Sequence, residues 1–189
     1  MLIAFAPFIV FAVLDRLVGV REGLIAGAVV SIVLVARERM RGRSAKVLEV
    51  GSALLFGGLA AYTLAANPVW SIVGVRLAVD TGLLVIVLVS LAIHRPFTHQ
   101  YARERVPAEH WGSPLFTRTT SVITAAWAVA FALLVVADLV MLYAPEIPHQ
   151  VGVGITITAL AGAFKFTDWY PDRARELAAA APQNPLTGS

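Results

Sequence analysis

Residues 121–143 read SVITAAWAVAFALLVVADLVMLY, a stretch in which Asp138 is the only charged residue. A bilayer core about 30 Å thick requires roughly 20 apolar residues in a helix that crosses it. Lipid offers backbone groups no hydrogen-bond partners, so a crossing segment must be a helix or part of a closed barrel. Barrel strands alternate apolar and polar residues over about 10 positions, and this stretch does not. It therefore predicts a transmembrane helix.

The composition of the whole chain extends this prediction beyond one segment. Of 189 residues, 58% are hydrophobic and 14% are charged, whereas soluble domains have about 25% charged residues. We expect an all-α polytopic membrane bundle of about six transmembrane helices in three hairpins, forming a single domain over residues 1–170. The expected spans are residues 2–14, 18–36, 48–66, 69–93, 119–143 and 150–168. The first two are short, which predicts that they lie obliquely or form a tight hairpin.

The loops predict the orientation, because loop Lys and Arg residues remain on the cytoplasmic side. The chain has fifteen such residues, and most of them fall in three segments that the six-span map puts on one side. These are Arg37, Arg39, Arg41, Arg43 and Lys46, then Arg95, Arg103, Arg105 and Arg118, and finally Lys165, Arg173 and Arg175. We therefore expect a multi-pass protein of the bacterial plasma (inner) membrane with both termini cytoplasmic.

Two segments outside the spans have their own patterns. Residues 94–118 combine Phe97 and Tyr101, four apart, with nearby Arg residues, which favours a short helix in the cytoplasmic interface. Residues 171–189 are expected to form a cytoplasmic helix that starts at Pro171 and a disordered tail.

Ionisable residues at membrane depth are the main candidates for function, because charges there are costly and usually pair or line a polar path. The candidate intramembrane polar cluster comprises Asp15, Arg16, Arg21, Glu22, Arg76, Asp80 and Asp138. Arg76 and Asp80 are spaced i,i+4 and share a helix face. One interpretation is a cavity open to the outer face, with Asp80 and Asp138 handling protons or cations. The other, which we favour because acids and bases nearly balance, is a neutralising ion-pair network.

The basic segment between the second and third spans has two interpretations as well. Arg37, Arg39, Arg41, Arg43 and Lys46 are candidate contacts for anionic lipid head groups, or they act as a topology signal only. The second reading is favoured, and the two are compatible. Since these basic residues lie in loops between apolar blocks, topology explains them without a nucleic-acid partner.

No catalytic or metal-binding pattern stands out. The chain has no phosphate-cradling GxxxxGKS, no GxSxG, no HExxH and no dinucleotide fingerprint. His94, His99 and His110 share a loop, but helical metal ligands need spacings of three or four. We therefore expect no cofactor, no metal site and no enzyme activity.

Several short stretches resemble the intracellular septation protein A family, the YciB-type bacterial inner-membrane proteins. They are residues 5–11, the sequence FGGL at 56–59, RPF at 95–97, Pro107 and Trp111, and AWAVAF at 126–131. The resemblance implies a role in cell-envelope synthesis and division through protein partners, and no catalytic residues. The chain departs from the family pattern in its charged outer half and its basic loop at 94–118.

These observations lead to two hypotheses. The first is a non-enzymatic membrane protein with a structural or interaction role in envelope organisation or septation, whose partners are the lipid bilayer and other envelope or division membrane proteins. The alternative is a small transporter or channel with a charged pathway near Arg76, Asp80 and Asp138. A lipid-modifying enzyme has little support. The Gly-rich stretch 51–60 is compatible with packing inside one chain or in a homo-oligomer.

Overall fold

The computed structural model describes residues 2–104, 106–144 and 146–180. Every regular element in these ranges is helical, which confirms the all-α prediction. The elements are η1 Leu2–Phe5, α1 Ala6–Leu17, α2 Val20–Met40, α3 Val47–Ala66, α4 Ile72–Ala92, α5 Phe97–Ala102, η2 Ala108–His110, α6 Pro114–Tyr143 and α7 His149–Ala180.

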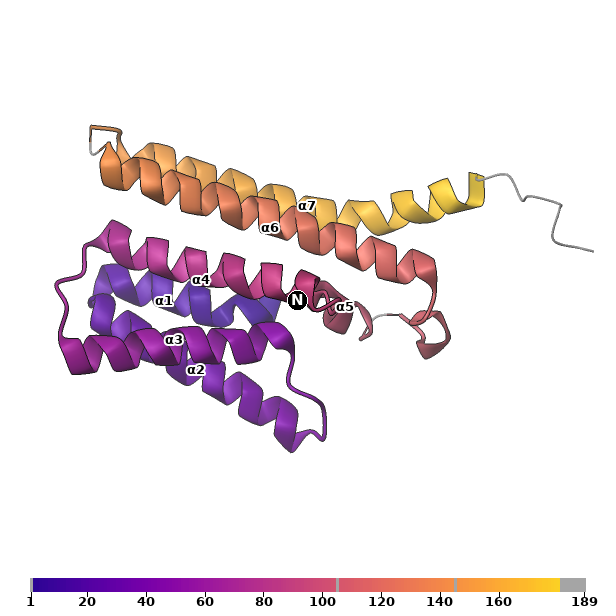
Figure 1. Ribbon diagram of the computed structural model, residues 1–189, viewed down its shortest axis with the longest axis horizontal. Coiled ribbons are helices and arrows are strands. Elements are labelled where there is room, and N and C mark those ends of the chain that lie inside the picture. Colours follow the sequence, from indigo (N-terminus) through magenta and orange to yellow (C-terminus); the bar gives the residue numbers. More distant parts are fainter. Residues whose placement is uncertain (1, 105, 145, 181–189) are drawn as a thin grey trace, which may run out of the picture.

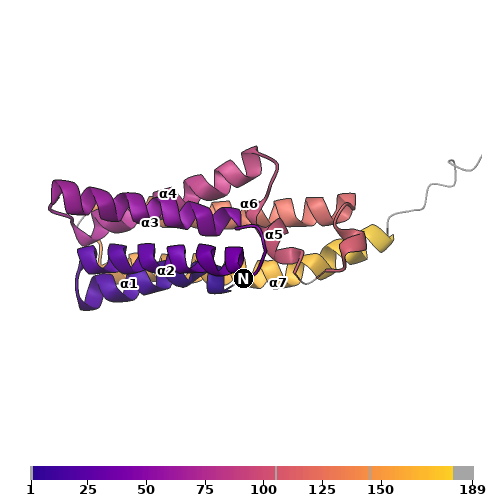
Figure 2. The ribbon, with the colours of Figure 1, turned by 90° about the horizontal axis from the view of Figure 1, so that it is seen from below.

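The long helices run lengthwise along the molecule in three antiparallel pairs (Figures 1 and 2). The pairs are α1 with α2, α3 with α4, and α6 with α7. The first pair packs on the second mainly through α2 and α3, and the second packs on the third through α4 and α6. The C-terminal ends of α1, α3 and α6 lie at the same end of the molecule (Figure 1). We call this the turn end.

Three helices, α3, α4 and α6, are long and apolar enough to cross a membrane. They contain the predicted spans 48–66 and 119–143 and most of 69–93. The predicted spans 2–14, 18–36 and 150–168 fall largely within η1, α1, α2 and α7. Helix α1 has 12 residues, about 18 Å at 1.5 Å per residue, and is shorter than the hydrocarbon core. The structure thus supports membrane association in general terms.

Local sequence signals determine where the helices begin and how closely they approach. The Ser71 hydroxyl accepts a hydrogen bond from the Gly74 amide at 2.9 Å and caps α4. Ser113 caps α6 in the same way, with Pro114 in the first helical position. At the α1–α2 turn, Gly19 has φ +147°, which favours glycine. A Cβ at Gly23 would lie 3.0 Å from the Asp15 amide nitrogen, so glycine permits this close packing of α1 and α2.

An aromatic cluster joins η1, which precedes α1, to the third helix pair in the half of the molecule away from the turn end. Trp127 of α6 is fully buried and stacks on Phe5 with ring centroids 4.9 Å apart. Phe164 of α7 meets the same indole edge to face at 4.8 Å. The Trp127 Nε1–H donates to Thr167 Oγ1 at 2.9 Å, so the polar atom of the ring is satisfied. We call Phe5, Trp127, Phe131 and Phe164 the aromatic core.

Two segments differ from their predicted form. Helix α7 continues through Pro171, whereas a separate helix starting at this residue was expected. Proline removes one backbone donor and bends a helix without always ending it, and α7 bends along its length (Figure 1). The segment predicted to form a disordered tail, 182–189, lies outside the described residues.

The short helix expected within residues 94–118 is present as α5, but its aromatic residues face the protein. Phe97 is fully buried and Tyr101 is 7% exposed. The Phe97 ring lies 6.4 Å from Trp127, and the Phe97 amide donates to Ser90 Oγ at 3.3 Å. Helix α5 is therefore packed on α4 and α6 through the two aromatic residues on which the prediction of an interfacial helix was based.

Candidate functional site: a charged pocket

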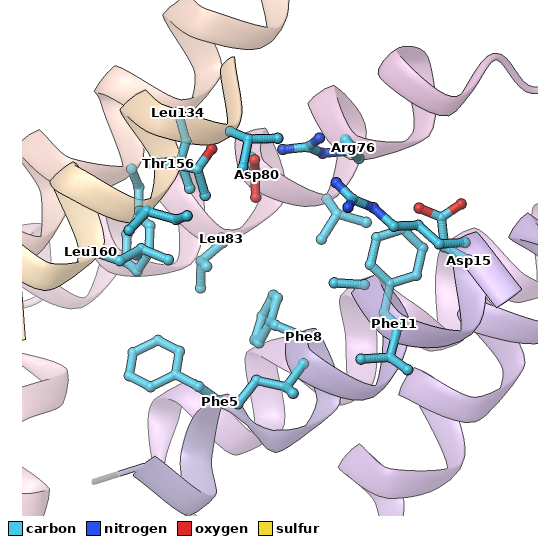
Figure 3. Close-up of a pocket in the computed structure, with 18 of the residues that line it drawn as sticks. Phe5, Phe8, Phe11, Asp15, Arg76, Asp80, Leu83, Leu134, Thr156 and Leu160 are labelled. Atoms are coloured by element: carbon cyan, nitrogen blue, oxygen red, sulfur yellow. The ribbon is translucent and has the colours of Figure 1, made fainter. Parts of the chain in front are cut away.

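A pocket of about 620 Å³ lies among α1, α4, α6 and α7. Figure 3 shows Arg76 and Asp80 of α4 on one side of it and Phe5 and Phe8 across from them. Its ionisable lining residues are Asp15, Arg16, Arg76 and Asp80, and the rest are mainly aromatic and aliphatic. The volume falls within the range of roughly 300 to 1,000 Å³ that is common for ligand sites. The pocket therefore combines an apolar wall with a small group of charges.

Arg76 is paired across helices rather than along its own. Its Nη2 lies 3.9 Å from Asp138 Oδ1 of α6, whereas the i,i+4 spacing suggested Asp80. Asp80 of α4 is a neighbour of the same Asp138 carboxyl group. Arg76 therefore faces two neighbouring carboxyl groups, and this contact joins the second helix pair to the third.

Two carboxylate oxygens of this region have no hydrogen-bond partner among the described residues: Asp15 Oδ1 and Asp138 Oδ2. Asp15 is 7% exposed and Asp138 only 1%. A buried acceptor without a donor costs about 1 to 3 kcal/mol, and more when it is charged. Such oxygens mark a place where a donor from outside the chain would be stabilising.

The structure brings together most of the predicted polar cluster. Asp15, Arg16, Arg76 and Asp80 line the pocket, and Asp138 contacts Arg76 behind it. The other two members, Arg21 and Glu22, are exposed at the start of α2 and do not line the pocket. The cluster therefore contains the ion pair of Arg76 with Asp138 beside a cavity, and both interpretations of its function stay predictions.

The candidate lipid contacts divide into two groups. Arg37, Arg39, Arg41 and Arg43 are exposed near the end of α2, as a lipid contact requires. Lys46 is not, because its side chain is only 12% exposed. Its Nζ lies 2.7 Å from Glu104 Oε1, 3.7 Å from Glu49 Oε1 and 3.8 Å from Glu38 Oε2. Lys46 is thus paired with acids of its own chain, as Arg43 is with Glu104 at 3.7 Å, and is less available to a lipid head group than Arg37, Arg39 and Arg41.

Lys46, Glu38, Glu49, Glu104 and Tyr101 form a cluster, the Lys46 cluster, that sequence reasoning missed. The hydrogen bond from Lys46 holds the pKa of Glu104 below its usual range. Burial raises the pKa of Tyr101, whose ring lies 4.6 Å from Lys46 Nζ. Glu38 Oε2 and the Tyr101 hydroxyl are buried without a hydrogen-bond partner in the described residues. No local spacing links Lys46 to Glu104, so the sequence offered no signal for this contact.

The histidine-containing loop offers no metal site within the described ranges, where no group of three potential His, Cys, Asp or Glu ligands is close enough. His99 Nδ1 lies 3.2 Å from Thr120 Oγ1. Burial, aided by the charge of Arg103, lowers the pKa of His99. His99 therefore contributes to the contact between α5 and α6.

Comparison of the chain with protein-family models, with curated proteins and with solved structures finds no match. The resemblance to the septation family accordingly stays a prediction, carried by the short motifs in the sequence alone.

Proposed function

We propose that the chain is a six-span protein of the bacterial inner membrane with both termini cytoplasmic. Support comes from the three helix pairs, whose turns share one end of the molecule. At this end the connection at 67–71 has no Lys or Arg, and Arg16 and Arg21 beside the α1–α2 turn are offset by Asp15 and Glu22. The opposite end has Arg37, Arg39, Arg41 and Arg43. Reporter fusions after residues 42 and 69 should report opposite sides of the membrane. The same side for both would contradict the six-span map.

In this topology, α5 lies at the level of the cytoplasmic head groups, and the exposed Arg residues of α2 face anionic lipids. The charge of these residues supports the assignment, because basic groups at a membrane surface are attracted to anionic lipids by about 1 kcal/mol each. Helix α5 then contacts the bundle through Phe97 and Tyr101 and through Gln100, whose Oε1 accepts a hydrogen bond from the Val47 amide at 2.7 Å.

The function that we propose is a non-enzymatic structural or interaction role in cell-envelope organisation or septation, exercised through other membrane proteins. The observation that carries it is the aromatic core, in which Phe5, Trp127 and Phe164 pack in direct contact. These packed rings would block an ion or solute path that ran along the pocket. This favours a protein that acts through contacts with other proteins over a channel. The resemblance to the septation family supplies the cellular process.

Depletion of the protein followed by microscopy tests this role. We expect elongated cells, misplaced septa or a leaking envelope, and rescue by the intact chain. Normal cell length, septum placement and envelope integrity after complete depletion would contradict the proposal. Crosslinking in the membrane from an exposed position, such as Leu54 of α3 (73% exposed), should then capture envelope or division proteins.

A second candidate function is transport, and the pocket is the observation that favours it. Arg76, Asp80 and Asp138 are grouped beside a cavity, and charged groups inside a membrane often handle ions or protons. Flux assays on reconstituted protein test this candidate, together with Asp80→Asn, Arg76→Gln and the double variant. If Asp80→Asn alone impairs the protein while the double variant works, pairing explains these residues. If the reconstituted protein shows no ion or solute flux, transport is excluded.

A further inference from the structure

The polar and apolar parts of the pocket lie at different depths. Along α1, Phe8 is seven residues before Asp15. Along α4, Leu83 is seven residues after Arg76, and along α7, Phe164 is eight residues after Thr156. At 1.5 Å per residue each of these separations is about 10 to 12 Å. The hydrocarbon layer of one leaflet is about 15 Å thick. We call the part of the pocket around Asp15, Arg16, Arg76 and Asp80 the head region, and the part around Phe8, Leu83 and Leu160 the apolar region. Their combined depth is close to the thickness of one leaflet.

The rim of the pocket is apolar on the side between α1 and α7. Ile9, Val13 and Leu17 of α1 line the pocket and are 49% to 76% exposed. Ile157 of α7 lines it from the other side and is 62% exposed. Helix α1 packs mainly on α2, and the rings of Phe5 and Phe164 meet only at the deep end, with centroids 6.1 Å apart. An apolar side opening admits a hydrocarbon chain from the bilayer more readily than a hydrated solute.

The head region bears charges of both signs in equal number, namely two Asp and two Arg. The buried Asp15 Oδ1 lacks a donor, and a carboxylate oxygen can only accept. Arg76 has its ion-pair contact at 3.9 Å, which is longer than a hydrogen bond. A ligand that satisfies both residues must have a cationic donor for Asp15 and an anionic acceptor for Arg76. A purely anionic or purely cationic head group would satisfy only one of them.

We propose that the pocket binds one phospholipid of the outer leaflet with a zwitterionic head group that contains a primary ammonium, as in phosphatidylethanolamine. The ammonium donates to Asp15, the phosphate accepts from Arg76 and Arg16, and one acyl chain lies along Phe8, Leu83 and Leu160. This inference goes beyond the proposed cellular role; its assignment to the outer leaflet rests on the proposed six-span topology, whereas lipid binding itself is measured on purified protein.

Fluorescence quenching by brominated lipids tests the proposal, because Trp127 lines the pocket and is fully buried from the outside. The experiment uses a chain in which Trp70, Trp111 and Trp169 are replaced by Phe, reconstituted with lipids that have brominated acyl chains. Brominated phosphatidylethanolamine should quench Trp127 at a lower mole fraction than brominated phosphatidylglycerol. Equal quenching by both lipids, or no quenching by either, would overturn the proposal.

Variants separate the head region from the apolar region. Asp15→Asn and Arg76→Gln should each reduce the preference for the ethanolamine lipid about tenfold, the loss expected for a charge-assisted hydrogen bond. Arg21→Gln is the matched control, because Arg21 is exposed and outside the pocket, and should leave the preference unchanged. Leu160→Phe, which fills the apolar region, should reduce quenching by every lipid, whereas Leu133→Phe on the outer surface of α6 should not. The opposite pattern would contradict the assignment.

A final arm distinguishes a lipid from a soluble ligand of the same chemistry. Glycerophosphoethanolamine has the head group without acyl chains. It should not displace the brominated lipid at millimolar concentration. Displacement by this compound would assign the site to a water-soluble zwitterion and overturn the lipid proposal, even if the head-group contacts were correct.

Discussion

The charged groups at the two ends of the molecule are organised differently. In the Lys46 cluster one ammonium lies within 3.8 Å of three carboxylates. At the turn end, Arg76 reaches Asp138 only at 3.9 Å, and the charges border a cavity of about 620 Å³. Charges that surround one central group leave no room for a ligand and stabilise the fold. Charges that border an empty volume are poorly satisfied by the protein and are suited to binding.

The largest effect is expected from Lys46→Met, which removes the central charge of the Lys46 cluster. Three carboxylates, of which Glu38 and Glu49 are buried, would then lack their common partner. Breaking a buried pair in this way costs about 3 to 5 kcal/mol of unfolding free energy. Reversible unfolding in mixed micelles measures it. Arg39→Met, at an exposed position, is the control. Equal unfolding free energies of the two variants would contradict the stabilising role of the Lys46 cluster.

The exposed Arg residues of α2 should affect lipid binding instead of stability. Replacing Arg37, Arg39 and Arg41 together by Gln should weaken binding of phosphatidylglycerol to the protein by about 1 kcal/mol per residue. The unfolding free energy should change by less than about 0.5 kcal/mol per substitution. Titration of the protein in mixed micelles with labelled phosphatidylglycerol measures the first quantity. If Lys46→Gln weakened this lipid binding as much as one of these Arg changes, the division of the basic segment would be wrong.

A smaller effect is expected for the pair at the turn end. A double-mutant cycle with Arg76→Gln and Asp138→Asn should give a coupling free energy of at most about 1 kcal/mol, because the contact at 3.9 Å lacks hydrogen-bond geometry. The same cycle for Lys46→Gln and Glu104→Gln, whose atoms lie 2.7 Å apart, should give more. A larger coupling at Arg76 would favour the ion-pair network over the pocket.

Acidification should weaken the end of the molecule that contains α5 more than the turn end. The pKa of Glu104 is lower in the folded protein than its ordinary value. Its contribution to the unfolding free energy is therefore complete above the ordinary pKa and is lost as the pH falls through the folded pKa. The pKa of His99 is also lowered, so stability decreases as the pH falls below its ordinary value of 6.5. The melting temperature should fall by a few degrees between pH 7 and pH 4. Glu104→Gln should make that decrease smaller, and an unchanged decrease would contradict the assignment.

Long apolar stretches made most of the helices predictable. Residues 48–66 and 119–143 were expected to be helical, and α3 and α6 contain both. Helix α6 begins earlier than expected, at Pro114, because Ser113 and Pro114 form a start signal that apolar periodicity does not reveal. Pro171 was expected to begin a new helix, yet the loss of one backbone donor was not enough to interrupt α7.

The candidate site was predictable only as a set of residues and not as a geometry. Charge at membrane depth identified Asp15, Arg76 and Asp138 without structural information. Their contacts depend on how separate helices pack, so the i,i+4 spacing of Arg76 and Asp80 named a partner on the same helix and missed the one on α6. Lys46 was grouped with its exposed neighbours for a similar reason, since its closest acid, Glu104, is far away in the sequence.

Helix α7 has 32 residues, about 48 Å at 1.5 Å per residue, which exceeds the thickness of a bilayer core. One part of it forms a wall of the pocket through Thr156 and Leu160, and the part beyond Pro171 extends past the helix bundle (Figure 1). A protein that binds to this extension contacts the same helix that forms one wall of the pocket. If attachment changes the tilt of α7, it changes the affinity of the pocket, and by reciprocity pocket occupancy changes attachment by the same factor.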